Sequence, residues 1–351
     1  MSILIHLFHL HITHISNVCQ QGICGFCKWG DVLFKIQSTL KEIYDAVHIL
    51  PIQSCLISGG NFFEENGALS LTELQKKNPT WFADDILYGL ERLKSSYEVH
   101  NVYPQDDARL SAVKLTWLPA KEKKHSTYVL LMAGGAYGAV CTMVEALPVA
   151  AKLNELGYDC FCLNYRTAVQ ESFVKGLFPE PMDDLAAAVR YIYKHKDHFG
   201  IDPQDYAVSG FSAGGHLAST WGTAHLGARK YDLPQPKCLI LGYPLISMSH
   251  VPESPVKQYL CTGMFGAGYT QVDIEKYDAS RHIDRDYPPC FLVRAQDDPT
   301  VPMAEGDGMV SILKEKCCLD QAKTGGHGFG LGTATPLHGW VERAAKWMEE
   351  L

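Results

Sequence analysis

The sequence lacks several features that would by themselves point to a partner or a compartment. Its apolar stretches are too short to span a bilayer, which argues against a transmembrane protein. It also has no basic face, because its 351 residues carry a formal charge of −8 and the densest positive run, at residues 121–124, is typical of an exposed hairpin turn. We therefore expect no membrane and no nucleic-acid partner.

A convincing secretory signal is also missing, although the chain contains twelve cysteines. The apolar start lacks a positively charged segment, is interrupted by histidines, and is not followed by a small-residue cleavage site. Several cysteines lie inside apolar, strand-like runs: Cys160, Cys162, Cys238 and Cys290. Buried free cysteine behaves as a small hydrophobic residue. We expect core thiols in a cytoplasmic protein, with disulfides as the alternative.

The first 69 residues differ from the rest and are interpreted as an N-terminal extension. They contain His6, His9, His11 and His14, followed by Cys19, Cys24 and Cys27. Histidine and cysteine are common zinc ligands, but this spacing completes no recognised template, and we assign no metal. A dispensable or wrongly included segment is favoured over a structural addition or a metal site. Activity is expected to survive removal of residues 1–60.

The domain proper is expected to cover residues 70–351. It opens with Ser70 and Glu73, which form the S-x-x-E pattern of a capping box. From about residue 112, strand-like runs alternate with helical runs. Strands are expected at residues 112–118, 127–132, 159–164, 206–209, 237–243, 289–295 and 317–323. This alternation is typical of an α/β fold with a mostly parallel sheet and helices on both faces. In such folds functional groups gather at the carboxyl ends of the strands.

The motif Gly210-Phe211-Ser212-Ala213-Gly214 lies between a strand-like run and a helical run. It has the G-x-S-x-G pattern of a nucleophile elbow. A serine on such a sharp turn adopts strained backbone angles, and the flanking glycines remove Cβ atoms that would clash. The helix N-terminus beneath the hydroxyl favours negative charge. Ser212 is therefore the predicted nucleophile.

A serine hydroxyl needs a base, and the base needs an acid that orients it. The strand-like run that ends at Ala295 leads into Asp297 and Asp298, and the run that ends near Lys323 leads into His327. An acid and a histidine thus follow the serine in the chain order of elbow hydrolases. We predict Asp298 as the acid and His327 as the base, and interpret Asp297 as a solvated or turn-capping residue.

The glycine-rich loop after the strand at residues 127–132 fits the second part of an oxyanion hole. A tetrahedral intermediate needs two or more donors directed at its oxyanion. We predict the backbone N–H groups of Gly135 and Ala136, together with that of Ala213, the residue after the nucleophile. Tyr137 and Phe329 are candidates for lining the substrate pocket.

These segments together resemble the α/β-hydrolase esterases of the bacterial acetyl-esterase and acetyl-xylan-esterase type, which are related to the hormone-sensitive-lipase group. The matching pieces are residues 133–137 (AGGAY), 163–166 (LNYR), 210–217 (GFSAGGHL), 297–302 (DDPTVP) and 326–329 (GHGF). The family usually has Pro-Gly-Gly-Gly-Tyr or His-Gly-Gly-Gly at the oxyanion loop, where this chain has Ala133 and Ala136. An alanine at a position that needs a positive φ is strained.

The resemblance implies an α/β-hydrolase fold, a triad of Ser212, Asp298 and His327, and hydrolysis of short-chain esters without a cofactor. The expected partner is a small-molecule ester, including acetyl groups on a saccharide. A prolyl-oligopeptidase-like peptidase, an arylformamidase and a catalytically silent binding module are the alternatives. The sequence leaves open whether residues 243–289 form a lid.

Overall fold

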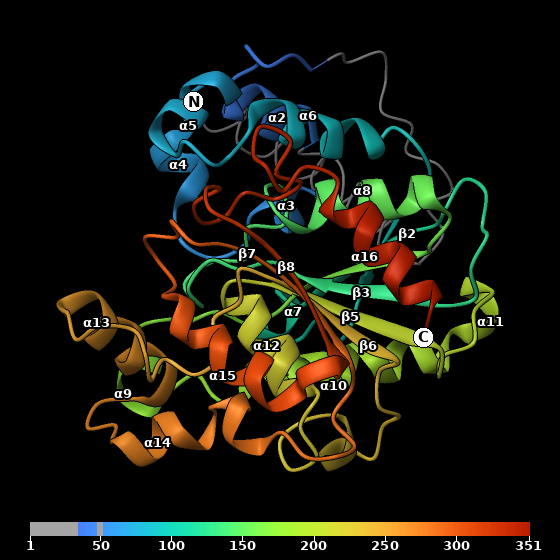
Figure 1. The fold of residues 1–351 in the computed structure, drawn as a ribbon. Coiled ribbons are helices and arrows are strands. Elements are labelled where there is room, and N and C mark those ends of the chain that lie inside the picture. Colours follow the sequence, from blue (N-terminus) through green and yellow to red (C-terminus); the bar gives the residue numbers. More distant parts are fainter. Residues whose placement is uncertain (1–33, 48–51) are drawn as a thin grey trace. The chain divides into compact units, whose positions relative to one another are not determined.

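An eight-stranded sheet organises the computed structural model, which describes residues 34–47 and 52–351 (Figure 1). The strands are β1 (Glu98–Asn101), β2 (Lys114–Leu118), β3 (Tyr128–Met132), β4 (Cys160–Asn164), β5 (Tyr206–Phe211), β6 (Cys238–Gly242), β7 (Cys290–Ala295) and β8 (Cys317–Ala322). Their order is β1-β2-β4-β3-β5-β6-β7-β8. β2 is antiparallel to both of its neighbours, and all other neighbouring strands are parallel. The predicted mostly parallel sheet is confirmed.

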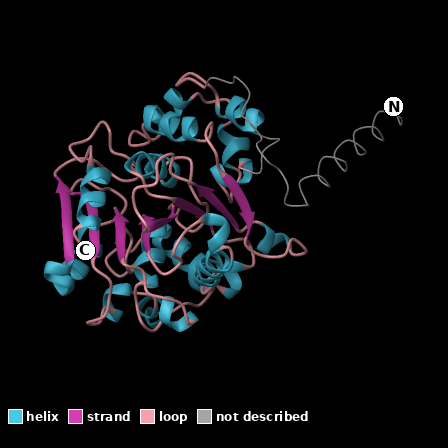
Figure 2. Cartoon of the chain, turned by 90° about the vertical axis from the view of Figure 1, so that its right-hand side faces the viewer, coloured by secondary structure: helices cyan, strands magenta, loops and turns pink. Residues whose placement is uncertain are grey.

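The central strands are buried along their whole length because helices cover both faces of the sheet. Every residue of β3, β4, β5, β6 and β7 is buried, as expected for parallel strands between two helical layers. α8 (Ala146–Leu156) and α16 (Trp340–Glu349) cover one face, and α10 (Glu180–Lys194), α12 (Ala213–Trp221) and α15 (Met303–Leu313) cover the other (Figures 1 and 2). α8 ends at Gly157, whose φ of +101° forms a left-handed C-cap.

Shorter helices fill the connections and the N-terminal part of the described chain. They are α2 (Leu40–Val47), α3 (Gln53–Leu56), α4 (Phe62–Asn66), α5 (Leu71–Lys77), α6 (Ala83–Arg92), α7 (Ala108–Ser111), α9 (Ser172–Lys175), α11 (Lys196–Phe199), α13 (Pro255–Phe265) and α14 (Gln271–Lys276), with 3₁₀ turns η1 (Ala228–Tyr231), η2 (Ala279–His282) and η3 (Lys314–Lys316). The predicted capping box at Ser70 and Glu73 opens α5. None of the helices in the described part of the chain is both long and apolar enough to cross a membrane.

Residues 34–47 and 52–69, which the sequence analysis assigns to the extension, belong to the same compact unit as the rest of the described chain. Leu40, Ile43 and Leu56 are fully buried there. The backbone of Ser58 pairs with that of Val140, and Met143 donates its N–H to the Leu56 carbonyl. This part of the extension therefore holds the chain just after the predicted oxyanion loop. Residues 1–33, with their histidines and cysteines, lie outside the described residues.

The four cysteines that the sequence places in strand-like runs are buried. Cys160, Cys162, Cys238 and Cys290 are free thiols inside the sheet. Burial raises the pKa of the Cys238 thiol to about 12. These side chains therefore act as small apolar core residues.

A truncation pair tests how far the extension supports the fold. Removing residues 1–60 eliminates several fully buried side chains, each contributing about 1.5–3 kcal/mol to folding. In place of the retained activity that the sequence suggests, we now expect a melting temperature lowered by at least about 5 °C and a loss of esterase turnover. Removing only residues 1–33 is the matched control, because it leaves every described contact in place. Equal melting temperatures for the two truncations, measured by calorimetry, would contradict this prediction.

Candidate active site

Ser212 lies on a strained turn between β5 and α12, with φ +51° and ψ −117°. The turn brings backbone atoms too close for side chains at the flanking positions. A Cβ on Gly210 would lie 2.1 Å from the Gly214 carbonyl oxygen, and one on Gly214 would lie 2.2 Å from the Met132 oxygen. Close contact therefore requires glycine at both positions. The turn leaves Ser212 partly exposed beside the N-terminus of α12.

Ser212, His327 and Asp298 lie in one hydrogen-bonded chain. The Ser212 Oγ is 2.9 Å from His327 Nε2, and His327 Nδ1 is 2.7 Å from Asp298 Oδ2. The other carboxylate oxygen of Asp298 accepts the N–H groups of Thr300 at 2.7 Å and Val301 at 2.8 Å. The carboxylate is thus fixed by the turn that the sequence analysis singled out, and it can hold Nδ1–H so that Nε2 accepts the serine proton.

Asp297 has a different position from its neighbour. Its side chain is exposed, and its Oδ1 accepts the N–H of Gly326 at 2.8 Å. This contact ties the loop after β7 to the loop that carries His327. Asp297 therefore supports the histidine loop and makes no recorded hydrogen bond to the imidazole among the described residues.

The histidine loop is also braced by the segment between α5 and α6. Thr80 donates its hydroxyl hydrogen to the carbonyl oxygen of His327. The fit is close, because a Cβ on Gly326 would meet Thr80 Cγ2 at 2.8 Å and one on Gly328 would meet Trp81 Nε1 at 3.1 Å. Both glycines also have positive φ. The loop can reach Ser212 only because these positions carry no side chain.

The predicted oxyanion loop leaves the carboxyl end of β3, next to the end of β5. Gly135 has φ +130°, and Ala136 has φ +55°, so the alanine lies in the left-handed region at a cost of about 1–2 kcal/mol. The N–H groups of Gly135, Ala136 and Ala213 have no hydrogen-bond partner among the described residues. Two unpaired donors thus lie in the loop after β3, and the third belongs to the residue directly after Ser212.

The two residues predicted to line a pocket offer almost no surface. Tyr137 and Phe329 are each 1% exposed. The Tyr137 hydroxyl hydrogen-bonds His216 Nδ1 at 2.8 Å, and the other ring nitrogen of His216 lies 2.8 Å from the Tyr277 carbonyl oxygen. Both ring nitrogens of His216 therefore have partners inside the protein. Tyr137 belongs to the same buried network, and the structure gives no support to its predicted pocket role.

Glu145 and Tyr243 are two residues near the site that the sequence analysis does not single out. Glu145 is 5% exposed, and its Oε2 accepts the N–H of Gly134 at 2.5 Å. The Tyr243 hydroxyl donates to the same carboxylate and accepts the N–H of Gly330 at 3.2 Å. The Tyr243 ring also lies edge-on to the His327 ring, with centroids 5.0 Å apart. These two side chains therefore connect the oxyanion loop to the histidine loop.

Burial raises the pKa of Glu145 above its ordinary value, although the Gly134 N–H and the charge of His327 act in the opposite direction. Burying a carboxylate costs free energy unless the group is hydrogen-bonded or paired. Its only recorded partners among the described residues are the loop N–H and the Tyr243 hydroxyl. We therefore interpret Glu145 as a positioning residue for the oxyanion loop.

A pair of substitutions at position 145 tests this interpretation. Glu145→Ala removes the acceptor of the Gly134 N–H, and kcat for an ester should fall by about 10²-fold with KM little changed, because the donors move. Glu145→Gln retains an acceptor oxygen and should stay within about tenfold of the unmodified chain. Steady-state kinetics measures both, and an unchanged kcat for Glu145→Ala would exclude the positioning role.

The same pair gives a pH signature. Because the pKa of Glu145 is raised, the folded chain holds this proton more tightly than the unfolded chain does. The group therefore makes folding less favourable as pH rises above the ordinary carboxyl pKa of about 4.3. Glutamine does not ionise, so the stability of Glu145→Gln relative to the unmodified chain should increase from about pH 4 to about pH 7. Urea unfolding at several pH values measures the difference.

No metal-ligand cluster occurs at this site among the described residues; the one such group in that part of the chain is Glu98, His100 and His198. A small cavity beside Asp298 is lined by Tyr243, Pro244, Arg294 and Val301, among others, and its volume of about 10 Å³ is room for about one water molecule.

Comparison with known proteins places this site in a family context. The model of the BD-FAE family matches residues 116–313. The acetylxylan esterase of Xylanibacter ruminicola is 27% identical over 254 residues, which are 70% of this chain and 49% of that protein. Endo-1,4-beta-xylanase B of Butyrivibrio fibrisolvens is 27% identical over 195 residues, which are 54% of this chain and 29% of that protein. The chain thus spans less than half the length of these curated relatives.

Solved structures give the same fold. The acetyl ester-xyloside bifunctional hydrolase from Caldicellulosiruptor lactoaceticus is 27% identical, with a TM-score of 0.60 over 72% of this chain and 96% of that chain. The carboxylesterase Cest-2923 from Lactobacillus plantarum is 19% identical, with a TM-score of 0.57 over 73% of this chain and 98% of that chain. The predicted α/β-hydrolase fold and the resemblance to acetyl-esterase-type enzymes are confirmed.

Proposed function

Because the chain belongs to the BD-FAE family, we propose that it is a serine esterase that hydrolyses short-chain, chiefly acetyl, esters of small molecules. The observation that carries the proposal is the 2.9 Å contact between Ser212 Oγ and His327 Nε2, at a site flanked by unpaired backbone N–H groups. Relatives named as esterases and carboxylic ester hydrolases support the same class of reaction.

In the proposed reaction, the Ser212 oxygen attacks the ester carbonyl carbon while His327 Nε2 takes the hydroxyl proton. Asp298 holds Nδ1–H, which fixes the tautomer and stabilises the imidazolium. The N–H groups of Gly135, Ala136 and Ala213 donate to the oxyanion of the tetrahedral intermediate. The imidazolium then protonates the departing alcohol, and the acyl group stays on Ser212. Water, activated by His327, releases the acid by the same steps in reverse.

We propose acetylated saccharides as the natural class of substrate. The names of two relatives, an acetylxylan esterase and an acetyl ester-xyloside hydrolase, support this class. The reaction needs no cofactor, since every group in the proposed steps is a side chain or backbone N–H of this chain.

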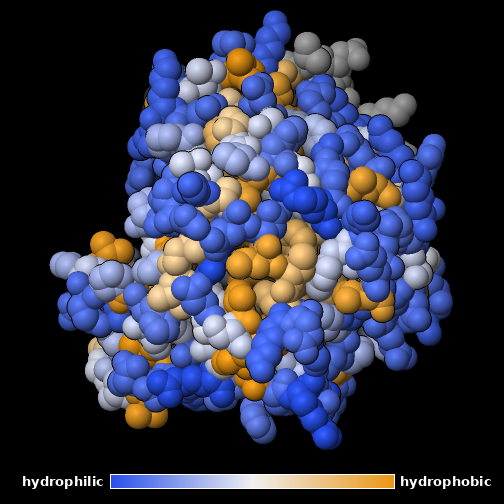
Figure 3. Space-filling model, viewed as in Figure 1, coloured by the Kyte–Doolittle hydropathy of each residue, from blue (hydrophilic) through white to orange (hydrophobic). Residues whose placement is uncertain are grey.

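Exposed apolar side chains occur on three neighbouring helices, and two of these helices lie within residues 243–289, the candidate lid. Val174 on α9, Val256 and Tyr259 on α13 and Val272 on α14 are each at least 64% exposed, and apolar side chains gather over these helices in Figure 3. α13 and α14 lie within residues 243–289; α13 packs against α9 through Tyr259 and Phe173, and α14 packs against α13. We propose that these three helices border the substrate entrance.

Substrate selectivity tests the proposed function. The purified chain should hydrolyse p-nitrophenyl acetate with a kcat/KM at least about tenfold above that for the decanoate. It should also remove acetate from acetylated xylo-oligosaccharides. Ser212→Ala should lower kcat at least about 10³-fold, whereas Ser249→Ala, a hydroxyl outside the site, should not. Faster cleavage of a prolyl anilide or an aryl formamide would favour a peptidase or an arylformamidase. Absence of fluorophosphonate labelling at Ser212 would favour a silent module.

The neighbouring aspartates provide a matched test of the acid. Asp298→Asn removes the charge that stabilises the imidazolium and should lower kcat by about 10²–10⁴-fold. Asp297→Asn keeps an acceptor for the Gly326 N–H and should cost less than about tenfold. The two substitutions are at neighbouring positions of one turn, so circular dichroism can show whether either of them disturbs the fold. A larger loss in Asp297→Asn would reverse the assignment.

A further inference from the structure

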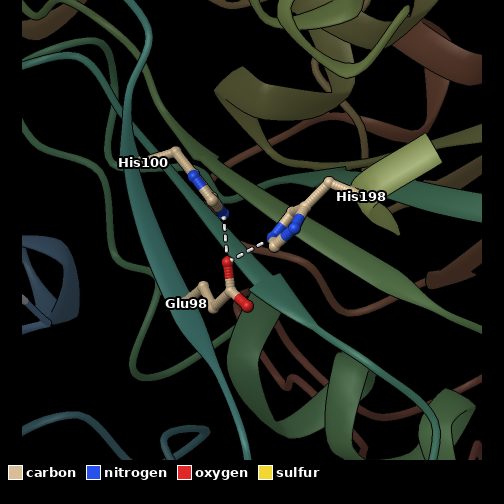
Figure 4. Close-up of side chains that lie close together, drawn as sticks. All are labelled: Glu98, His100 and His198. Carbon is tan, nitrogen blue, oxygen red and sulfur yellow. Dashed lines mark hydrogen bonds and ion pairs between the residues drawn. The ribbon is translucent and has the colours of Figure 1, made fainter. Parts of the chain in front are cut away.

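A second cluster of titratable side chains lies at the other edge of the sheet. Glu98 and His100 are alternate residues of β1 and share one face of the strand, and His198 reaches them from α11 (Figure 4). Glu98 opens β1, and α11 leads into β5, so both lie at the amino edge of the parallel strands. Ser212 lies at the carboxyl edge. The cluster is therefore separate from the proposed esterase site.

The spacing of the three side chains matches that of zinc ligands. Glu98 Oε2 lies 3.2 Å from His100 Nε2 and 2.8 Å from His198 Nε2, and all three ligand atoms lie within 4.8 Å of one another. In a tetrahedral zinc site with bonds of about 2.0–2.1 Å, neighbouring ligand atoms are separated by about 3.3 Å. Small rotations of the Glu98 and His198 side chains would place three bonds on one ion beside His100, with water as the fourth ligand.

The Nε2 atom of His100 is unsatisfied without a cation. It is buried and has no hydrogen-bond partner among the described residues, because the approach of Glu98 lacks hydrogen-bond direction. The His100 Nδ1 lies 3.2 Å from the Tyr191 hydroxyl, and a hydrogen bond at the other ring nitrogen is what orients most metal-binding histidines.

Aromatic packing also fixes both imidazoles before any ion binds. The His100 ring packs edge-on to Phe199 with centroids 5.2 Å apart, and the His198 ring lies 5.7 Å from the ring of Trp117. A site held in this way loses little side-chain freedom on binding. The alternative to a metal is a surface ion pair between Glu98 and His198, which contributes little to stability and leaves His100 Nε2 without a partner.

We propose that Glu98, His100 and His198 bind one Zn²⁺ ion, which fastens the edge strand β1 to α11. β1 pairs with one neighbour only, and its four residues are at best partly buried. A metal bond to α11 stabilises this edge, which is otherwise among the weakest parts of a sheet. The ion has a structural role, because the cluster is remote from Ser212.

Zinc binding to the full, chelator-treated chain tests the proposal. Calorimetric titration with Zn²⁺ alone should give a binding event that raises the melting temperature by about 5 °C at a concentration 100 times Kd. One equivalent of bound zinc and the thermal shift should be lost in His198→Gln and in Glu98→Gln. They should persist in His225→Ala, which removes an exposed histidine outside the cluster. Ester turnover should not change in any of these variants.

Residues 1–33 contain further histidines and cysteines, so the comparison between variants decides the location. Loss of one zinc equivalent, together with the thermal shift, in His198→Gln and Glu98→Gln supports the site. Unchanged stoichiometry and thermal shift in these two variants would overturn it, as would no binding to the unmodified chain. The absorption spectrum of the Co²⁺-loaded chain distinguishes the two locations. Cysteine ligands give sulfur charge-transfer bands, whereas the nitrogen and oxygen ligands of this cluster do not.

Discussion

The hydrogen bond between Ser212 and His327 joins residues 115 positions apart, and the candidate site depends on this contact. It forms because β3, β5, β7 and β8 run parallel and end at one edge of the sheet. Each strand delivers one loop: the oxyanion loop, the serine turn, the aspartate turn and the histidine loop. The register of the strands therefore sets the distances between the side chains of the candidate site, and the loops change those distances only slightly. Strain at Ser212 is borne by the well-packed strand and helix on either side.

Support for these loops comes from parts of the chain that have no chemistry of their own. Thr80 and Trp81 brace the histidine loop, and residues 56–58 hold the segment after the oxyanion loop. Glu145 and Tyr243 connect the two loops from inside the protein. A rigid surrounding of this kind keeps donors and acceptors in place without reorganisation during the reaction. The described N-terminal helices and the segments between them thus belong to the rigid surroundings of the candidate site.

The sequence predicted the elements whose signal is local. The alternating runs gave seven of the eight strands, and the capping box at Ser70 was found because its partners are three residues apart. β1 was missed, since its residues Glu98–Asn101 lack an apolar alternation and are ordered by pairing with β2. Glu145 was seen only as the start of a helical run. Its contacts with Gly134 and Tyr243 arise from the fold, and no spacing in the sequence signals them. The cluster of Glu98, His100 and His198 escaped notice for the same reason.

The methyl group of Ala136 changes the free energy of both the folded and the unfolded chain. Its φ of +55° is a conformation that glycine adopts without strain, so the alanine makes the folded loop less favourable. The same methyl group also restricts the unfolded chain, which offsets part of that cost. The offset is smaller than the cost, so the alanine makes folding less favourable overall. A residue with fewer accessible backbone states also fluctuates less around its native angles. Alanine at position 136 thus makes the backbone of the oxyanion loop, with its unpaired N–H groups, more strained but also stiffer.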